Sequence, residues 1–276
     1  MTHNKKTVAF SVAKHMFFVF YALLSLVPFV WVLSSSFKDN TAIFTQPFSL
    51  PATLSFHNYV QAWGSANIGS YFFNSFVISI ITVVAQAMIV SMAAYILTRV
   101  LNAPAIVSYL TIGLMVPIHA LLIPNFIIMR DLGLMNNKLG LILIYTAVNT
   151  SFGYFLMSGY MQGIPRELDE AATIDGAGYI RTFFSVIFPV SKTAIATVGT
   201  FAFLNSWNEF LFALVINTRL DAMTITQGIN NLRGQYSTDF GLLCAGLMFA
   251  IVPVIIMYVL LQEQVVKGMT AGAVKG

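Results

Sequence analysis

HMFFVFYALLSLVPFVWVLSSSF, residues 15–37, is a run of 23 residues without a single Asp, Glu, Lys or Arg. An α-helix that crosses a bilayer needs about 20 predominantly apolar residues, and the apolar core of a signal peptide is shorter than this run. No A-x-A cleavage site follows the run. We therefore expect it to remain in the chain as a membrane-spanning helix.

Five more apolar runs of spanning length follow along the 276-residue chain. The chain is 58% hydrophobic and 9% charged, with a mean hydropathy of +0.80. The runs lack the period-2 alternation of a membrane β-barrel, and a helix satisfies its own backbone hydrogen bonds in lipid. We therefore predict an all-α integral membrane protein with six transmembrane helices in a single domain, residues 1–276. The five runs, in which Glu209 is the only charged residue, are 71–97, 106–128, 139–161, 194–216 and 240–261.

The distribution of basic residues predicts the orientation of these helices. Nine Lys and Arg residues fall on the side that holds both termini, and five fall on the other side. Because cytoplasmic loops retain basic residues, we predict cytoplasmic tails at 1–14 and 262–276 and a cytoplasmic loop at 165–189. The outer segment 38–70 is expected to be a loop, and the outer segment 217–239 is polar. The nine are Lys5, Lys6, Lys14, Arg99, Arg166, Arg181, Lys192, Lys267 and Lys275, and the five are Lys38, Arg130, Lys138, Arg219 and Arg233.

The predicted cytoplasmic loop contains ELDEAATIDGAGYIRTFFSVIFP, residues 167–189. Pro165 suits the first position of a helix, and the acidic residues after it suit the first turns, where the helix dipole favours negative charge. A bend is predicted at Asp175 and Gly176. After it, apolar residues recur at helical spacing until Pro189, and they are Ile180, Phe183, Phe184 and Ile187.

The loop is therefore expected to form two short helices around a glycine bend. The first presents Ala171 and Ala172, which allow close approach, beside carboxylates that can pair with a partner's Arg or Lys. Such a helix is typical of a docking element. The alternative is an interfacial hairpin that only connects two spans, and three acids beside an anionic leaflet argue against it.

The sequence offers no catalytic or metal-binding motif. Cys244 is the only cysteine, and the four histidines form no H-E-x-x-H or other ligand spacing. The formal net charge is +4, but the basic residues are scattered, so we predict no nucleic-acid partner. The phosphate loop G-x-x-x-x-G-K-[ST] is also missing, so this chain has no ATP site of that kind. We expect a non-enzymatic chain that binds no metal or cofactor of its own.

The loop sequence resembles the EAA motif of ABC importer permeases, in which E-A-A and a glycine precede I-x-L-P. The matching positions are Glu170, Ala171, Ala172, Gly176, Val186, Phe188 and Pro189, where Val186 and Phe188 replace the Ile and Leu of the pattern. The resemblance implies a type I ABC importer permease bundle whose loop forms coupling helices that dock a cytosolic ATPase. Glu170 would engage the ATPase and Gly176 would permit the bend. The docking residues would be Glu170, Ala171, Ala172, Asp175, Gly176 and Pro189.

Two further stretches, WNEF at 207–210 and GMTAGAVKG at 268–276, resemble the carbohydrate-uptake branch of these permeases. This is the maltose-transporter type without a large extracellular insertion. The resemblance implies a second homologous permease, an ATPase dimer that binds ATP-Mg, an extracytoplasmic sugar-binding protein, and the sugar and membrane lipid as partners. It also implies that 217–239 probes the binding protein. The tail would contact the ATPase through Gly268, Thr270, Gly272 and Lys275, although terminal residues alone would be expected to fray.

Polar residues within the spans are candidates for a translocation path, and they are Asn205, Asn208, Glu209 and Gln86. A charge at the bilayer centre costs about 2.5 to 3.5 kcal/mol, so we expect Glu209 to face a wet cavity or a partner. Asn205 precedes it by four residues, on the same helical face. A structural pairing between helices is the alternative for Glu209, as helix packing is for Gln86 and the stripe Ser75, Ser79 and Thr82.

In the third span, Pro117 and Pro124 indicate either a hinge or a fixed curvature.

Together these features predict a permease subunit of an ATP-driven ABC importer in the inner (cytoplasmic) membrane, which forms the translocation path for a di- or oligosaccharide. A permease for another solute would keep the EAA loop. An ion-coupled secondary transporter would need no ATPase, but it would need coupling-ion groups in the membrane, where Glu209 is almost the only candidate.

Overall fold

The computed structural model describes residues 5–234 and 238–273, and in this part of the chain all regular elements are helices. The chain divides into two compact units, residues 1–69 with 229–250 and residues 70–228 with 251–276. Within the described residues, four helices are long and apolar enough to cross a membrane, and there are up to six spans if each of two bent helix pairs is one span. The predicted all-α class is confirmed, and the helices agree with six spans counted in this way.

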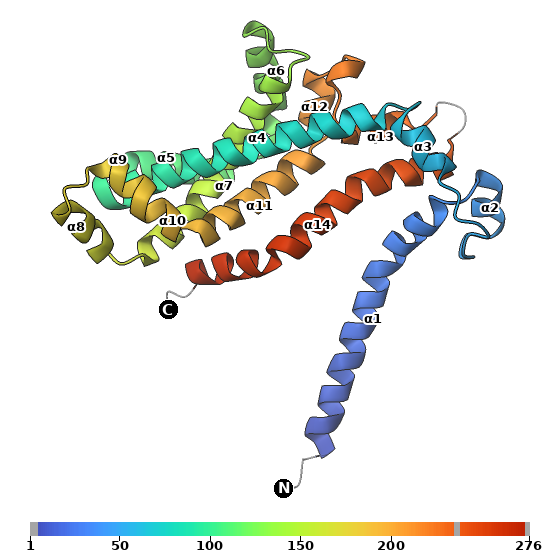
Figure 1. Ribbon diagram of the computed structural model, residues 1–276, viewed down its shortest axis with the longest axis horizontal. Coiled ribbons are helices and arrows are strands. Elements are labelled where there is room, and N and C mark those ends of the chain that lie inside the picture. The colour runs from blue at the N-terminus through green and yellow to red at the C-terminus, as the bar shows by residue number, and fades with distance from the viewer. Residues whose placement is uncertain (1–4, 235–237, 274–276) are drawn as a thin grey trace. The chain divides into compact units, whose positions relative to one another are not determined.

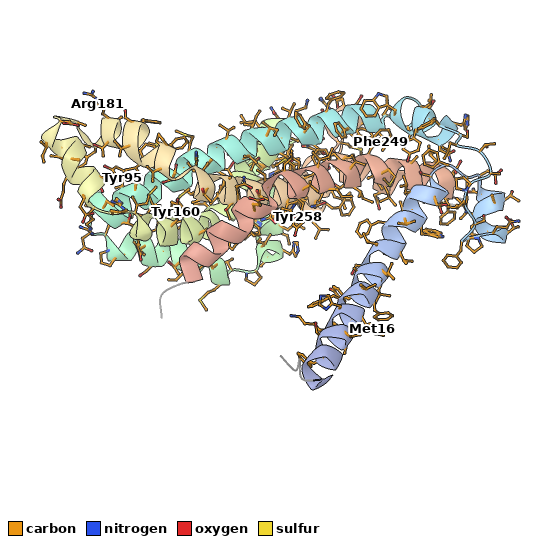
Figure 2. The ribbon with its side chains drawn as sticks, turned by 60° about the horizontal axis from the view of Figure 1, so that its bottom comes forward. Met16, Tyr95, Tyr160, Arg181, Phe249 and Tyr258 are labelled. Carbon is orange, nitrogen blue, oxygen red and sulfur yellow. The ribbon has the colours of Figure 1, made fainter. Side chains whose placement is uncertain are left out.

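Unit one contains α1 (Lys5–Ser35), α2 (Asn40–Thr45), α3 (His57–Trp63) and the start of α14 (Phe240–Ala273). The apolar side chains of α1 are exposed along the helix, as Met16 illustrates (Figure 2). In a bilayer, lipid or a neighbouring protein covers a surface of this kind. On α3, Trp63 lies 5.0 Å from the ring of Phe249 on α14.

The segment after α1 was expected to be a loop, and this is wrong because it contains α2 and α3. Side chains tie it to the end of α1. The buried Lys38 ammonium donates to the carbonyl oxygens of Gln46, at 3.2 Å, and of Ser49. Asn58 on α3 donates to the carbonyl oxygens of Ser36 and Lys38 at 3.0 and 2.9 Å. Asn58 therefore satisfies two carbonyls that follow the end of α1, and Lys38 anchors the segment that follows α2.

Unit two is built around α7 (Lys138–Gly163), which packs on α11 (Lys192–Asn208) (Figure 1). One half of α7, with Met157, joins a buried cluster with α4 (Ile68–Tyr95) and α11. The other half, with Leu141, joins a second cluster with α6 (Leu122–Asp131) and α12 (Leu211–Ile216). This two-sided burial makes α7 the central helix of the unit.

The predicted third span is broken. It consists of α5 (Pro104–Ile112), two short 3-10 turns, η2 (Gly113–Met115) and η3 (Ile118–Leu121), and α6, and its halves are bent by 101°. Pro117 stands at the break in an extended conformation, where its ring fixes φ and removes the N–H that a continuous helix would need. The bend expected from the prolines is therefore a sharp break at Pro117, whereas Pro124 lies inside α6.

The polar segment after α12 folds onto the start of α4. It contains the 3-10 turn η5 (Leu220–Ala222) and α13 (Ile225–Asn231). Asn74 on α4 donates to the carbonyl oxygens of Asp221 and Met223, both at 2.9 Å. Ser75 accepts the backbone N–H of Ile225 at 2.8 Å. This segment is thus held in place by polar side chains of α4.

The last helix is longer than predicted, because α14 continues to Ala273 instead of ending near residue 261. Beside it, the hydroxyl of Thr197 on α11 donates to the carbonyl oxygen of Gln264 at 2.9 Å. The expected tail at 262–276 is therefore helical as far as it is described.

Two glycines of α7 allow a matched test of the packing in unit two. A Cβ at Gly140 would lie 2.6 Å from the carbonyl oxygen of Leu134, whereas a Cβ at Gly163 would meet nothing within 4 Å. We expect Gly140→Ala to destabilise the purified protein by about 1–3 kcal/mol, because a backbone atom must move. Gly163→Ala should be neutral or slightly stabilising. Thermal unfolding in detergent measures both, and equal melting temperatures would contradict the close approach at Gly140.

Candidate functional site

The segment between α7 and α11 consists of short helical elements with a glycine bend after the first. It contains α8 (Glu167–Ile174), α9 (Tyr179–Thr182), the π-helical turn η4 (Phe183–Ile187) and α10 (Phe188–Val190). As expected, the first turn of α8 carries the acidic residues, and Gly176 takes a left-handed conformation with φ +74°. Pro165 is not the first helical residue, since Arg166 caps α8 and Pro165 precedes it.

One face of α8 is exposed along its length. It repeats at helical spacing and combines carboxylates with apolar groups, and Ile174 is 86% exposed. We call this face the α8 outer face, and it consists of Glu167, Glu170, Ala171 and Ile174. Ala172 was expected on the same surface, but it is only 6% exposed and lies on the opposite side of α8. Adjacent residues of a helix point about 100° apart, so Ala171 is exposed while Ala172 faces the spans.

The second half of the segment is only partly buried. Phe183 and Ile187 lie in the core, whereas Ile180 is 78% exposed and Phe184 is also exposed. The expected continuous apolar stripe is therefore split, because the chain passes through a π turn at these residues. Pro189 does not end the helical conformation, which continues through α10 to Val190. Arg181 projects outward from α9 (Figure 2).

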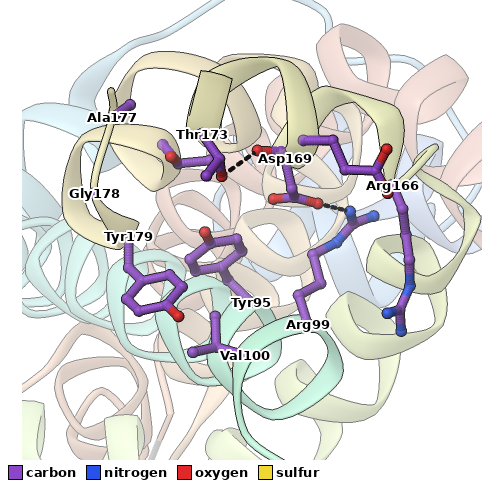
Figure 3. A pocket seen from close by; sticks show the side chains of 11 residues that line it. Tyr95, Arg99, Val100, Arg166, Asp169, Thr173, Ala177, Gly178 and Tyr179 are labelled. Carbon is purple, nitrogen blue, oxygen red and sulfur yellow. Dashed lines mark hydrogen bonds and ion pairs between the residues drawn. The ribbon is translucent and has the colours of Figure 1, made fainter. Parts of the chain in front are cut away.

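Arg99 holds α8 against the ends of two spans (Figure 3). It lies in the π-helical turn η1 (Ile96–Val100) that extends α4, and its side chain is 6% exposed. Its guanidinium group pairs with the carboxylate of Asp169 on α8. It also donates to the carbonyl oxygens of Met161 and Ile164 at 2.7 and 2.6 Å. A cavity of about 390 Å³ beside this contact is lined by Arg99, Arg166, Asp169, Glu170 and Tyr179, among others.

A second group of polar contacts lies between the spans of unit two. The amide of Gln86 on α4 donates to the carbonyl oxygen of Asn149 on α7, and the amide of Asn205 on α11 donates to the Oδ1 of Asn149, both at 2.7 Å. Asn149 thus joins three helices. Gln86 is buried together with Ser75, Ser79 and Thr82, which places the whole polar stripe of α4 inside the unit. This placement agrees with helix packing, whereas the exposed Asn205 and Asn208 remain available to a path or a partner.

Glu209 lies at a break in the predicted fifth span, between α11 and α12. Its two carboxyl oxygens accept the backbone N–H groups of Phe212 and Ala213 at 2.8 and 3.0 Å, so the side chain caps the start of α12. It also accepts the hydroxyl of Tyr145 on α7 at 2.7 Å. The continuous span 194–216 is therefore wrong. Asn205 and Glu209 both contact α7, the first through Asn149 and the second through Tyr145. Glu209 nevertheless lies outside α11, the helix that contains Asn205.

Three of the residues expected to contact the ATPase, Gly268, Thr270 and Gly272, belong to α14. The fourth, Lys275, lies outside the described residues. Within residues 5–234 and 238–273, no group of three or more His, Cys, Asp or Glu side chains could hold a metal ion.

Three residues of these contacts were not predicted as site residues from the sequence, namely Arg99, Tyr145 and Asn149. Arg99 was counted only for orientation, although a lone arginine at the end of an apolar run is a signal for a polar contact at the helix terminus. Asn149 is a polar residue in an uncharged span, which is a similar signal. Tyr145 carries no such signal because tyrosine is common in spans.

The chain is thus a bundle of apolar helices with an exposed acidic helix, α8, between two of its spans. A family model described as "Binding-protein-dependent transport system inner membrane component" matches residues 92–270, and the chain belongs to this family. It is therefore a permease subunit of a binding-protein-dependent importer and not an enzyme. This membership excludes the ion-coupled secondary transporter.

Among its relatives is the diacetylchitobiose uptake system permease protein NgcG of Streptomyces coelicolor, which is 34% identical over 95% of this chain and 88% of the relative. The melibiose/raffinose/stachyose import permease protein MelC of Bacillus subtilis is 30% identical over 92% of this chain and 93% of its own length. A solved structure, a bacterial ABC transporter involved in the import of the polysaccharide alginate, has a TM-score of 0.82. It is 23% identical and covers 95% of this chain and 99% of its own, so it supports the fold.

Proposed function

We propose that this permease imports a di- or oligosaccharide that an extracytoplasmic binding protein delivers, in a complex with a second homologous permease and a cytosolic ATPase dimer. The α8 outer face carries the proposal. It presents Glu170 beside the exposed Ile174 on a helix that is fixed to the spans, which suits a partner that pairs a basic group with an apolar pocket. ATP-Mg binds to the partner ATPase, not to this chain.

The sugar class rests on the relatives. Their names specify diacetylchitobiose and the melibiose, raffinose and stachyose series, and both relatives match nearly the whole chain. The sequence WNEF, which resembles the carbohydrate-uptake branch, lies at the break that contains Glu209. A permease for another solute is the alternative, and the uptake assay below distinguishes it.

The proposed orientation places both termini and α8 in the cytoplasm, in the inner (cytoplasmic) membrane. The excess of basic residues on that side supports it. The end of α14 would then extend toward the ATPase, and the segment 217–239 would face the binding protein. Within the spans, Asn205 and Asn208 are the path candidates that the structure leaves exposed, and amide groups of this kind suit sugar hydroxyls.

In the proposed mechanism, ATP binding closes the ATPase dimer, and α8 passes that movement to the spans. The spans alternate between an inward-open and an outward-open arrangement. ATP binding favours the outward-open one because ATP binds more tightly to the closed ATPase dimer than to the open one. The sugar enters from the binding protein when the path opens outward.

The test is purification of a tagged chain from its native membrane in a gentle detergent, with mass spectrometry of the co-eluting proteins. We expect a second permease and an ATPase with a phosphate loop. Reconstitution of this complex with its binding protein should then give ATP-dependent uptake of an oligosaccharide such as raffinose. Recovery of the chain alone, under conditions that preserve a known transporter complex, would contradict the assembly. Uptake of an amino acid or peptide instead would contradict the sugar class.

A further inference from the structure

The guanidinium group of Arg99 joins three segments that are distant in the sequence. It belongs to the turn η1 at the end of α4, it pairs with Asp169 on α8, and it donates to Met161 and Ile164 at the end of α7. The last carbonyls of a helix have no partner within the helix, and a cation at that end also meets the negative end of the dipole. The side chain of Arg99 therefore provides hydrogen-bond donors for two carbonyl oxygens at the end of α7 and holds α8 through Asp169.

The geometry favours an arginine over a lysine at this position. A guanidinium group has several N–H donors in a planar fork, so it can reach a carboxylate and two carbonyl oxygens at once. A lysine has a single ammonium group on a flexible stem, and it would lose part of this set. The side chain of Arg99 is 6% exposed and that of Asp169 is 24% exposed, so water replaces these contacts poorly.

Apolar packing supports the same arrangement from the other half of the segment. The ring of Phe183 in η4 lies 5.6 Å from the ring of Tyr95 at the end of α4, and both residues belong to the buried cluster of α4, α7 and α11. Leu168 on α8 packs against this cluster. The inner side of α8 is therefore attached to the spans by a partly buried ion pair and by apolar contacts, whereas the α8 outer face takes part in neither.

From this geometry we infer that Arg99 is the positioning residue of energy coupling, which makes α8 move as one body with α4 and α7. The inference rests on the proposed function, because it assumes that the ATPase acts on α8. Without Arg99, α8 would still offer Glu170 and Ile174 to the ATPase, but its movement would be passed incompletely to the spans. The loss would therefore affect transport more than ATP hydrolysis.

The experiment compares Arg99→Gln, Asp169→Asn and Arg99→Lys in the complete complex in liposomes, with the loaded binding protein added. The readout is the number of sugar molecules imported per ATP hydrolysed, together with the amount of ATPase that co-purifies. We expect Arg99→Gln to lower this ratio about tenfold, a typical size for a coupling between sites. Asp169→Asn should lower it less, because the two carbonyl contacts remain, and Arg99→Lys should restore part of it.

Arg130→Gln is the matched control, since Arg130 also pairs with an aspartate, Asp131, but both side chains are more than half exposed. It should leave the ratio unchanged. If the complex with Arg99→Gln does not assemble, the ratio measured for Asp169→Asn tests the inference instead. An unchanged ratio in Asp169→Asn and in every Arg99 variant that assembles would overturn the inference, as would transport that falls only in proportion to the amount of complex. A wild-type complex without ATP-dependent uptake would instead refute the proposed function.

Discussion

Replacing Glu209 by alanine is expected to abolish most of the folded protein. The substitution removes the acceptor of three hydrogen bonds, from the backbone of Phe212 and Ala213 and from the hydroxyl of Tyr145. A buried donor left without a partner costs about 1–3 kcal/mol, and a whole domain is stable by only about 5–15 kcal/mol. We therefore expect a large loss of monodisperse protein in detergent and a lower melting temperature in what remains.

Asn208→Ala is the control for Glu209, because Asn208 is the adjacent residue and its amide donates to the carbonyl oxygen of Leu204 in its own helix. It should change stability by less than about 0.5 kcal/mol. Equal stability of Glu209→Ala and Asn208→Ala would show that the cap contributes nothing. The milder variant Glu209→Gln keeps one acceptor oxygen and separates two roles. Altered transport with normal assembly would favour a path role, and lost assembly would favour the structural role.

The sequence predicted the apolar spans well but not their breaks. The uncharged runs are long and apolar enough to be recognised as candidate spans from the sequence. A break depends on local satisfaction of the backbone. Glu209 was recognised as an unusual charge, but only the structure shows that it caps α12 and so allows the fifth span to stop at Asn208.

For the candidate site too, local features were predicted from the sequence, whereas contacts between distant residues were not. The acidic first turn and the bend at Gly176 follow from helix dipoles and backbone preferences, which act over a few residues. The burial of Ala172 and the contact between Arg99 and Asp169 depend on which face of α8 packs on the spans. Those residues are 70 positions apart, so no local pattern contains the contact.

Replacing Glu170 by lysine is expected to stop transport while leaving expression and folding intact. Glu170 lies on the α8 outer face, is exposed, and is next to Ala171 and one turn before Ile174. Its reversal has little effect on the fold because an exposed residue contributes about 0.5 kcal/mol or less. At a docking surface, however, like charges that face each other cost several kcal/mol, so the ATPase should be lost from the complex. The measurement is the amount of ATPase that co-purifies with the tagged variant, together with ATP-dependent uptake.

Glu167→Lys is the matched control for Glu170→Lys, since it makes the same charge change on the same face one turn earlier. If a specific pairing at Glu170 holds the ATPase, Glu167→Lys should retain more of it than Glu170→Lys. Equal losses would mean that the total negative charge of α8 attracts the ATPase, and raised salt should then weaken the wild-type complex as well. Normal transport by Glu170→Lys would remove Glu170 from the mechanism. The remaining candidate anchors for the ATPase would then be two exposed apolar residues, Ile174 on α8 and Ile180 on α9.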